Sequence, residues 1–264
     1  MNMNEVVGTH DVLFLVFDTL RFDVAVAEWR GGRTPNLARV LPPTGWEERH
    51  TPGSFTYAAH QAFFAGFLPT PARPGRHARP FAIRFGGSET TTGETCVFDA
   101  PDLVRGFSSR GYRTICIGGV GFFNPENPLG RVLPSYFDEA HWSAETGVTD
   151  PRSTERQVTL ACARLEAVKE RVFLFINLSA LHQPNKHYVP GANEDSKDTH
   201  AAALRYVDSQ LPPLFKALRK RGPTLGLLMS DHGTCYGDDG YVGHRLAHPA
   251  VWTVPYAEVV LPSS

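Results

Sequence analysis

The segment from Thr224 to His248 concentrates side chains that can bind a metal ion. The apolar run TLGLLMS is followed directly by Asp231, His232 and Gly233, and further candidates come soon after, namely Asp238, Asp239 and His244. A carboxylate beside an imidazole suits zinc, manganese or iron. Adjacent Asp and His arise by chance in many sequences, so it is the position of the pair after a strand-like run and before a turn-forming glycine that favours a metal site.

Two other apolar runs also end in polar side chains. VLFLVF is followed by Asp18 and Thr19, and FLFINL is followed by a polar loop that contains His182. In a parallel sheet the carboxyl ends of the strands meet at one edge, where functional groups gather. The three runs therefore predict one site built from residues far apart in the chain.

Thr56 follows the turn-rich stretch Pro52-Gly53-Ser54 and precedes the helical pattern AAHQAFFAG. Ser and Thr are preferred helix N-caps, which is the simpler explanation of a hydroxyl at this place. The same geometry allows a second one: a helix N-terminus favours anions, so this hydroxyl could attack a phosphoryl group held there. His60 lies four residues later, on the same helix face, and could be a second anion contact.

Short apolar runs alternate with helical patterns along the chain. Runs typical of buried strands cover residues 11–17, 112–119, 171–179 and 224–230. Continuously apolar strands that alternate with helices predict an α/β fold with a central, mostly parallel sheet and helices on both faces. We expect one domain over residues 1–264, with a Pro/Gly/Thr-rich surface excursion of little regular structure around residues 69–95.

Prolines and glycines predict where two of the helices begin and end. Thr34 and Pro35 occupy N-cap and first-turn positions of a short helix. A longer helical pattern from residue 198 ends at Gly222, a C-cap residue, and the pair Pro212-Pro213 should kink or break it.

Composition limits the class of protein. The 264 residues are 42% hydrophobic and carry a formal net charge of −1, which suits a globular domain and gives no electrostatic argument for nucleic acid or an anionic membrane as partner. The four cysteines show no C-x-x-C spacing, and Cys116 and Cys162 are expected to be buried, reduced thiols. The first apolar run is too short for a signal or membrane segment, so we expect a cytoplasmic protein.

Five stretches in order along most of the chain resemble the sulfatase-like branch of the alkaline phosphatase superfamily. They are VLFLVFDTLRFD, TPNLARV, LRYVDSQLPPLFKALRKRG, LLMSDHGTCYGDDG and VWTVPY. The resemblance implies an alkaline phosphatase-like α/β fold. It also places Thr56 at the nucleophile position, where sulfatases have a Cys or Ser that is oxidised to formylglycine. Thr56 cannot undergo that oxidation, and the family's Pro-Ser-Arg is replaced by Ala58-Ala59-His60, so a formylglycine-dependent sulfatase is not expected.

A threonine nucleophile is what the phosphotransferases of this superfamily use, including phosphoethanolamine transferases. The resemblance implies that a metal ion is bound by Asp18, Thr56, Asp231 and His232. It further implies that His182 and His244 bind a second metal or the phosphoryl oxygens. The remaining expected substrate contacts are Thr19, which stands where sulfatases have a second Asp, together with Arg21, His60 and His248.

These residues predict a metal-dependent hydrolase or transferase that acts on a phosphate ester or diester through Thr56. The expected cofactor is one or two divalent ions, zinc or manganese, and the expected partner is a small anionic ester, with no nucleic acid, no membrane and an oligomeric state left open. Three alternatives stay open: a sulfate or phosphonate ester hydrolase with the same site, a non-catalytic metal- or ligand-binding protein that retains the fold, and a tailoring enzyme of a biosynthetic pathway.

Overall fold

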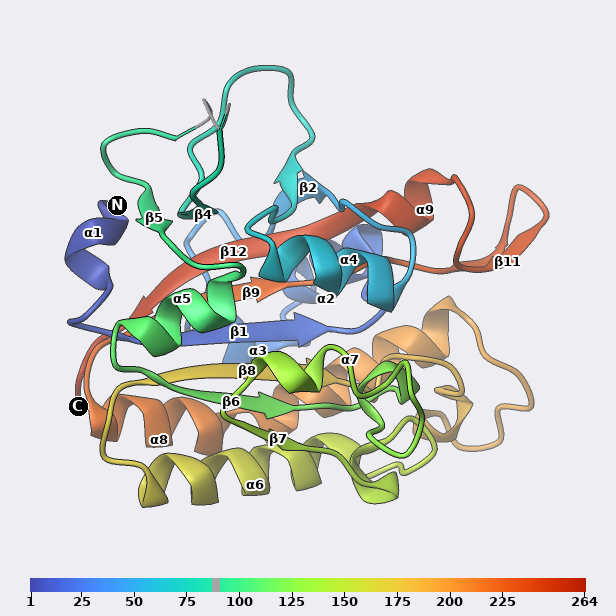
Figure 1. Ribbon diagram of the computed structural model, residues 1–264. Coiled ribbons are helices and arrows are strands. Elements are labelled where there is room, and N and C mark those ends of the chain that lie inside the picture. The colour runs from blue at the N-terminus through green and yellow to red at the C-terminus, as the bar shows by residue number, and fades with distance from the viewer. Residues whose placement is uncertain (87–90) are drawn as a thin grey trace.

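The computed structural model describes residues 1–86 and 91–264. A twisted sheet of eight strands runs through its centre (Figure 1) in the order β3-β2-β12-β9-β1-β8-β6-β7. The bounds of these strands are β1 Asp11–Phe17, β2 Glu47–His50, β3 Thr70–Pro71, β6 Arg113–Ile117, β7 Glu139–His141, β8 Val172–Leu178, β9 Thr224–Met229 and β12 Thr253–Leu261. Two small sheets lie outside it, parallel β4 (Phe81–Ile83) with β5 (Cys96–Phe98) and antiparallel β10 (Cys235–Asp238) with β11 (Tyr241–Gly243).

The centre of the large sheet is parallel, as the sequence predicts. Strands β9, β1, β8, β6 and β7 all run in one direction, and every residue of β1, β8 and β9 is buried. The other three strands are antiparallel additions at one side. Strand β12 was not predicted, because its sequence TVPYAEVVL contains a proline and a glutamate and lacks the continuous apolar pattern.

Helices cover both faces of the sheet (Figure 1), which confirms the predicted α/β class. On one face lie α2 (Phe22–Arg30), α3 (Pro35–Ala38), α6 (Ser153–Ala167), α7 (Lys197–Gln210) and α8 (Pro212–Arg221). On the other lie α1 (Met3–Val6), α4 (Thr56–Phe64) and α5 (Leu103–Ser109). A short α9 (Pro249–Trp252) precedes β12, and 3-10 helices occur at Gly121–Phe123, Pro134–Tyr136, Ala144–Thr146 and Lys186–Tyr188.

The helix termini follow the proline and glycine signals only in part. Leu211 separates α7 from α8, so the proline pair breaks the predicted helix, and Gly222 ends it with φ 147°. Thr34 stands at the N-cap of α3, but its hydroxyl makes no capping bond. The backbone N–H of Leu37 instead donates to the carboxylate of Asp208 in α7 at 2.7 Å. The N-terminus of α3 is therefore capped by a residue far away in the chain.

The segment 69–95 is only partly the surface excursion that the sequence predicts. Its residues before 80 are mostly exposed, but Phe81 is fully buried and packs on Phe14 and Phe107. The prediction is corrected here, because a single aromatic side chain anchors the segment to the core. Residues 87–90 of the predicted excursion lie outside the described residues.

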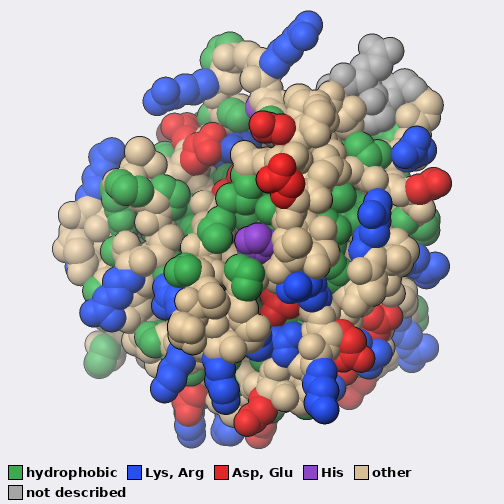
Figure 2. All heavy atoms as spheres, turned by 90° about the vertical axis from the view of Figure 1, so that its left-hand side faces the viewer, with side chains coloured by type: hydrophobic (Ala, Val, Ile, Leu, Met, Phe, Trp, Pro, Cys, Tyr) green, Lys and Arg blue, Asp and Glu red, His purple; other side chains and the backbone are tan. Residues whose placement is uncertain are grey.

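Within the described part of the chain, no helix has the length and apolarity needed to cross a bilayer. All four cysteines are free thiols, and Cys116 is buried as predicted whereas Cys162 is only partly buried. Both chain termini lie near the amino end of β1 (Figure 1). The face at that end carries basic and acidic side chains interspersed among apolar ones (Figure 2).

Candidate active site

The carboxyl ends of adjacent strands bring the candidate residues together. Asp18 directly follows β1, and Asp231 and His232 follow β9, which pairs with β1 in parallel. Thr56 is the first residue of α4. Its hydroxyl oxygen lies 3.4 Å from Oδ2 of Asp18 and 3.3 Å from Nε2 of His232. The hydroxyl therefore does not cap the helix, and the simpler N-cap explanation is wrong.

Asp18, Asp231 and His232 form a buried set of metal-type ligands. One ligand atom from each lies within 4.8 Å of the others, and all three side chains are inaccessible to solvent. The amide of Asn177 donates to Oδ2 of Asp18 at 2.8 Å, and the backbone N–H of Thr19 donates to Oδ1 of Asp231 at 3.1 Å. The second oxygen of each carboxylate, Oδ1 of Asp18 and Oδ2 of Asp231, has no hydrogen-bond partner.

The histidine of this set is oriented as a metal ligand would be. Nδ1 of His232 donates to the carbonyl of Gly233 at 2.9 Å, which leaves the lone pair of Nε2 directed toward Thr56 and the carboxylates. Gly233 is needed here because a Cβ would stand 1.9 Å from the carbonyl oxygen of Ala250. Unpartnered buried carboxylate oxygens are costly unless a cation balances them. The donor set therefore fits a divalent metal ion.

Electrostatics support the same conclusion. Burial, and then the charge of Asp231, raise the pKa of Asp18 to about 6. Burial raises the pKa of Asp231 to about 7, and burial lowers the pKa of His232. Raised pKa values of two neighbouring buried carboxyl groups mean that their ionised forms are destabilised, and a cation bound between them would stabilise both carboxylates.

His182 and His244 lie on the open side of this set. The ring centroid of His244 is 4.5 Å from that of His232 and 5.5 Å from that of His182. Nδ1 of His182 donates to the carbonyl of Gln183 at 2.6 Å, so Nε2 is its free nitrogen. Burial, and then the nearby histidines, lower the pKa of His244 to about 3. Both histidines and Thr56 line a cavity of about 400 Å³.

The four expected substrate contacts do not line this cavity. His60 is fully buried among phenylalanines, its Nδ1 donates to the carbonyl of Thr56 at 2.7 Å, and burial lowers its pKa to about 3. His60 thus contacts the first turn of α4 and also lies close to Asp231, since its Nδ1 is 3.7 Å from Oδ2 of that residue. Thr19 has a buried hydroxyl and contributes its backbone N–H.

Arg21 and His248 are engaged elsewhere. All three guanidinium nitrogens of Arg21 donate to Asp23, Asp238 or the carbonyl of Thr234. Nδ1 of His248 accepts the N–H of Ala250 at the start of α9, and its Nε2 faces Asp239. Local sequence could not show all of this, because two of the three partners of Arg21, Thr234 and Asp238, lie more than 200 residues away. Both side chains are thus bonded to groups of the protein outside the cavity, and their expected roles as anion contacts stay a prediction.

Two residues that sequence reasoning missed belong to the site. Asn177 is a polar side chain inside the apolar strand β8, which is a usable signal because buried polar groups have partners. Arg245 directly follows His244, lines the cavity with φ 70°, and lies over the ring of Phe55 at 5.5 Å. Its backbone N–H donates to the carbonyl of Ser54 at 2.9 Å. Nothing in the local pattern around Arg245 indicates this position.

Comparison with known proteins identifies the fold. No family model matches the sequence, and no curated protein is similar to it. Among solved structures, the C-terminal periplasmic domain of phosphoethanolamine transferase EptC from Campylobacter jejuni matches with a TM-score of 0.62 and 14% identity, over 96% of this chain and 80% of that one. The corresponding domain from Escherichia coli, in complex with zinc, matches with a TM-score of 0.63 and 14% identity. The match covers 97% of this chain and 74% of that one.

A protein in the alkaline phosphatase superfamily from Vibrio parahaemolyticus matches with a TM-score of 0.57 and 17% identity, over 97% of this chain and 60% of that one. The predicted alkaline phosphatase-like fold is thus confirmed. The cytoplasmic location stays a prediction, and the periplasmic origin of the two transferase domains does not favour it.

Proposed function

We propose that this protein is a metal-dependent phosphotransferase or phosphoester hydrolase with Thr56 as its nucleophile. The observation that carries the proposal is the position of the Thr56 hydroxyl, 3.4 Å from Oδ2 of Asp18 and 3.3 Å from Nε2 of His232, in a residue that lines a cavity. The similarity of the fold to phosphoethanolamine transferase domains supports the same reaction class.

Asp18, Asp231 and His232 would hold the metal ion, with Thr56 completing the set. When bound, a divalent ion supplies positive charge that favours an ionised hydroxyl and polarises a phosphoryl oxygen. The two unpartnered carboxylate oxygens and Nε2 of His232 are the donors available for it. Zinc is the proposed metal, since carboxylate and imidazole donors suit it and the E. coli domain binds zinc; manganese is the second choice.

The chain's own residues then have distinct tasks. Oγ of Thr56 loses its proton and forms the bond to phosphorus, while the ester oxygen leaves and is protonated, which gives a phosphothreonine that water or an alcohol resolves. The N–H groups in the first turn of a helix have no partner within the helix, and those of α4, which begins at Thr56, would bind the phosphoryl oxygens. Nε2 of His182 and the ring of His244 are placed on the open side to hold those oxygens or protonate the leaving group.

Arg245 adds a permanent positive charge at the same cavity. An arginine fork binds two oxygens of a phosphoryl group, so it favours an anionic ester. The rest of the lining is largely apolar and includes Val120, Phe122, Leu129 and Val148. The proposed substrate is therefore a small phosphoester whose leaving group has an apolar part.

Replacement of Thr56 tests the nucleophile. Thr56→Ala should abolish turnover of an activated aryl phosphate or phosphodiester while metal content, measured by elemental analysis, is largely kept. Thr56→Ser should retain part of the activity, and Thr9→Ala, at an exposed threonine far from the cavity, should change nothing. Full turnover by Thr56→Ala would remove Thr56 from the mechanism.

A substrate panel tests the reaction class. Aryl phosphate, phosphodiester, phosphonate and sulfate should be compared with the zinc-loaded protein. If the sulfate or the phosphonate is turned over faster than the two phosphate esters, the protein is a sulfate or phosphonate ester hydrolase and the proposed substrate class is wrong. Binding of metal without turnover of any member would favour the non-catalytic alternative.

A further inference from the structure

His182 and His244 reach the active-site cavity from two segments that are far apart in the chain. His182 lies in the loop between β8 and α7, and His244 directly follows β11 of the hairpin β10–β11. Their ring centroids are 5.5 Å apart. The His182 ring bonds to the carbonyl of its own neighbour, Gln183. This bond orients the ring within its loop but does not fix the loop relative to the hairpin.

Asn185 bonds to both segments. It is a fully buried polar residue three positions after His182. Its Nδ2 donates to the carbonyl of Leu181 at 2.9 Å and to the hydroxyl of Tyr236 in β10 at 2.8 Å. Among the described residues, no other hydrogen bond joins this loop to the hairpin. The amide of Asn185 therefore links the backbone next to one histidine to the strand pair that carries the other.

The side chain of Asn185 is held from its other end by α7. Its Oδ1 accepts the hydroxyl of Thr199 at 2.6 Å, and its backbone N–H donates to Oδ1 of Asp195 at 2.7 Å. Thr199 itself belongs to the capping box that begins α7. Every polar atom of the Asn185 side chain thus has a partner, and a buried amide that is fully bonded has one orientation.

The Tyr236 hydroxyl continues the chain of hydrogen bonds to a second residue of α7. It accepts a proton from Asn185 and lies 2.9 Å from Nδ1 of His200, which is fully buried. Burial, and then the charge of Arg21, lower the pKa of His200 to about 3. The His200 ring is therefore neutral, and its Nδ1 can accept the tyrosine proton. Strand β10 is thus anchored on α7 as well as on the loop that carries His182.

We propose that Asn185 and Tyr236 are positioning residues, which hold the two active-site histidines at the separation needed to bind oxygens of one phosphoryl group. This inference rests on the proposed function, in which His182 and His244 hold those oxygens. Neither Asn185 nor Tyr236 lines the cavity, so both act through the histidines. Their contribution is large because a displacement of about 1 Å in a group that binds the reacting atoms is costly.

Removal of the Tyr236 hydroxyl tests the inference. Zinc-loaded Tyr236→Phe should bind inorganic phosphate about three- to tenfold more weakly than the wild type in calorimetric titration, since two hydrogen bonds that fix the hairpin are lost. Its affinity for the first zinc ion should be unchanged, because the hydroxyl contacts none of the residues proposed to bind the metal.

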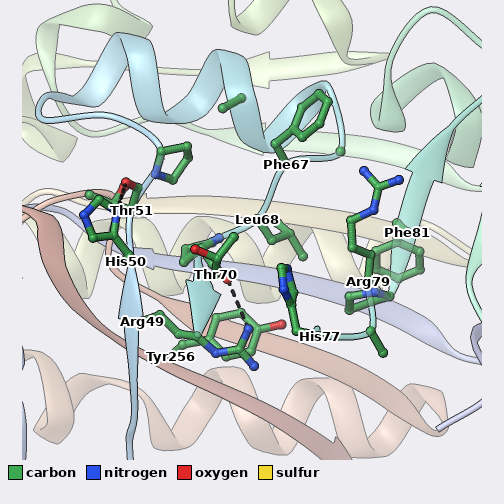
Figure 3. A pocket seen from close by; sticks show the side chains of 16 residues that line it. Arg49, His50, Thr51, Phe67, Leu68, Thr70, His77, Arg79, Phe81 and Tyr256 are labelled. Carbon is green, nitrogen blue, oxygen red and sulfur yellow. Dashed lines mark hydrogen bonds between the residues drawn. The ribbon is translucent and has the colours of Figure 1, made fainter. Parts of the chain in front are cut away.

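Two other tyrosines provide matched controls. The Tyr112 hydroxyl also has two partners, the N–H of Gly8 and the carbonyl of His10, and it lies before the amino end of β6. Tyr256 donates to Glu258 and borders a separate cavity of about 470 Å³ that neither active-site histidine lines (Figure 3). Tyr112→Phe and Tyr256→Phe should bind phosphate as the wild type does, whatever their effect on the free energy of unfolding.

A double-mutant cycle separates positioning from a general loss of stability. If Tyr236 acts through the histidines, Tyr236→Phe and His182→Ala together should weaken phosphate binding by less than the product of their separate effects. A fold that is merely weakened would give independent effects. Wild-type phosphate affinity in Tyr236→Phe, the same loss in either control, independent effects in the cycle or no phosphate binding by the wild type would each overturn the inference.

These measurements need no turnover. They can fail while Thr56→Ala still abolishes turnover, in which case the proposed nucleophile stands and the positioning role does not. They can equally succeed when Thr56→Ala keeps full turnover, so a failure of the inference and a failure of the proposed function are told apart.

Discussion

At the scale of single residues, the site is defined by which atoms have partners. Asp18 and Asp231 each use one carboxylate oxygen in a hydrogen bond within the protein and keep the other unpartnered, although both side chains are fully buried. Asn177 and the backbone of Thr19 thus fix the direction of the free oxygens. Such partners orient metal ligands before the metal binds.

Asp231→Asn should have opposite effects on stability with and without metal. In the presence of a chelator the variant should melt at a higher temperature than the wild type, because one of two repelling buried carboxylates is gone. With added zinc the order should reverse, because the variant loses a ligand. A difference of about 1–3 kcal/mol in unfolding free energy is expected in each condition. The same order under both conditions would contradict the assignment of a metal site.

Arg245→Gln should lower kcat/KM for a phosphoester about tenfold or more, since the variant loses a charge-assisted pair to the phosphoryl group. The effect should be larger for a dianionic monoester than for a monoanionic diester. Arg30→Gln, at an exposed arginine at the end of α2, is the control. Unchanged kcat/KM in Arg245→Gln would exclude the arginine from substrate binding.

At the scale of elements, the hairpin β10–β11 carries His244 and Arg245 into the site. This hairpin is tied to the loop after β1 by Arg21, which donates to the carboxylate of Asp238 at 2.7 and 3.0 Å and to the carbonyl of Thr234 at 3.0 Å. Arg21 therefore acts on the site through the position of the hairpin.

The Arg21–Asp238 pair predicts a pH dependence. The hydrogen bond from Arg21 holds the pKa of Asp238 well below its usual range. A carboxyl group with a lowered pKa in the folded state stabilises the protein at pH above about 4, and this contribution is lost as the pH falls further. Asp238→Asn should thus be less stable than the wild type at pH 7 by about 1 kcal/mol or less, since solvent screens the pair, and the difference should shrink progressively as the pH falls below about 4 in denaturant unfolding.

Asp239→Asn is the matched control for this prediction. Asp239 is the adjacent aspartate, its side chain is 84% exposed, and its positive φ of 50° is one that Asn tolerates. A pH-independent difference between Asp238→Asn and the wild type would contradict the electrostatic explanation.

At the scale of the whole molecule, one sheet separates two apolar layers. Along β1, Leu13, Leu15 and Phe17 pack on one face and Val12, Phe14 and Val16 on the other. The active site lies at the carboxyl edge of this sheet, so both layers determine where its ligands stand. Because every central strand contributes to both layers, neither layer can unfold alone without exposing the other.

The prediction of a single domain can be tested by unfolding. Trp46 belongs to one layer and Trp142 packs against the other. In variants that keep only one of these tryptophans, fluorescence should give the same denaturation midpoint, and far-UV circular dichroism should coincide with both. Two separate midpoints would show that the layers unfold independently and would argue against one domain.

The features that depend on local pattern could be predicted from the amino-acid sequence. Continuous apolar runs specify buried parallel strands, the proline pair specifies the break between α7 and α8, and the residues after the strands specify where Asp18, Asp231 and His232 meet. These signals are local because burial, periodicity and backbone restriction act on neighbouring residues.

The partners of each polar side chain, in contrast, depend on how distant parts of the chain pack together. In the folded chain Arg21 bonds to Asp238, His60 packs among phenylalanines, and Arg245 lines the active-site cavity. The physical reason is that hydrogen-bond direction and access to solvent depend on partners far away in the chain. No local sequence pattern contains those partners. The metal-type ligands could therefore be predicted from the sequence, whereas the hydrogen-bond partners of the side chains around them could not.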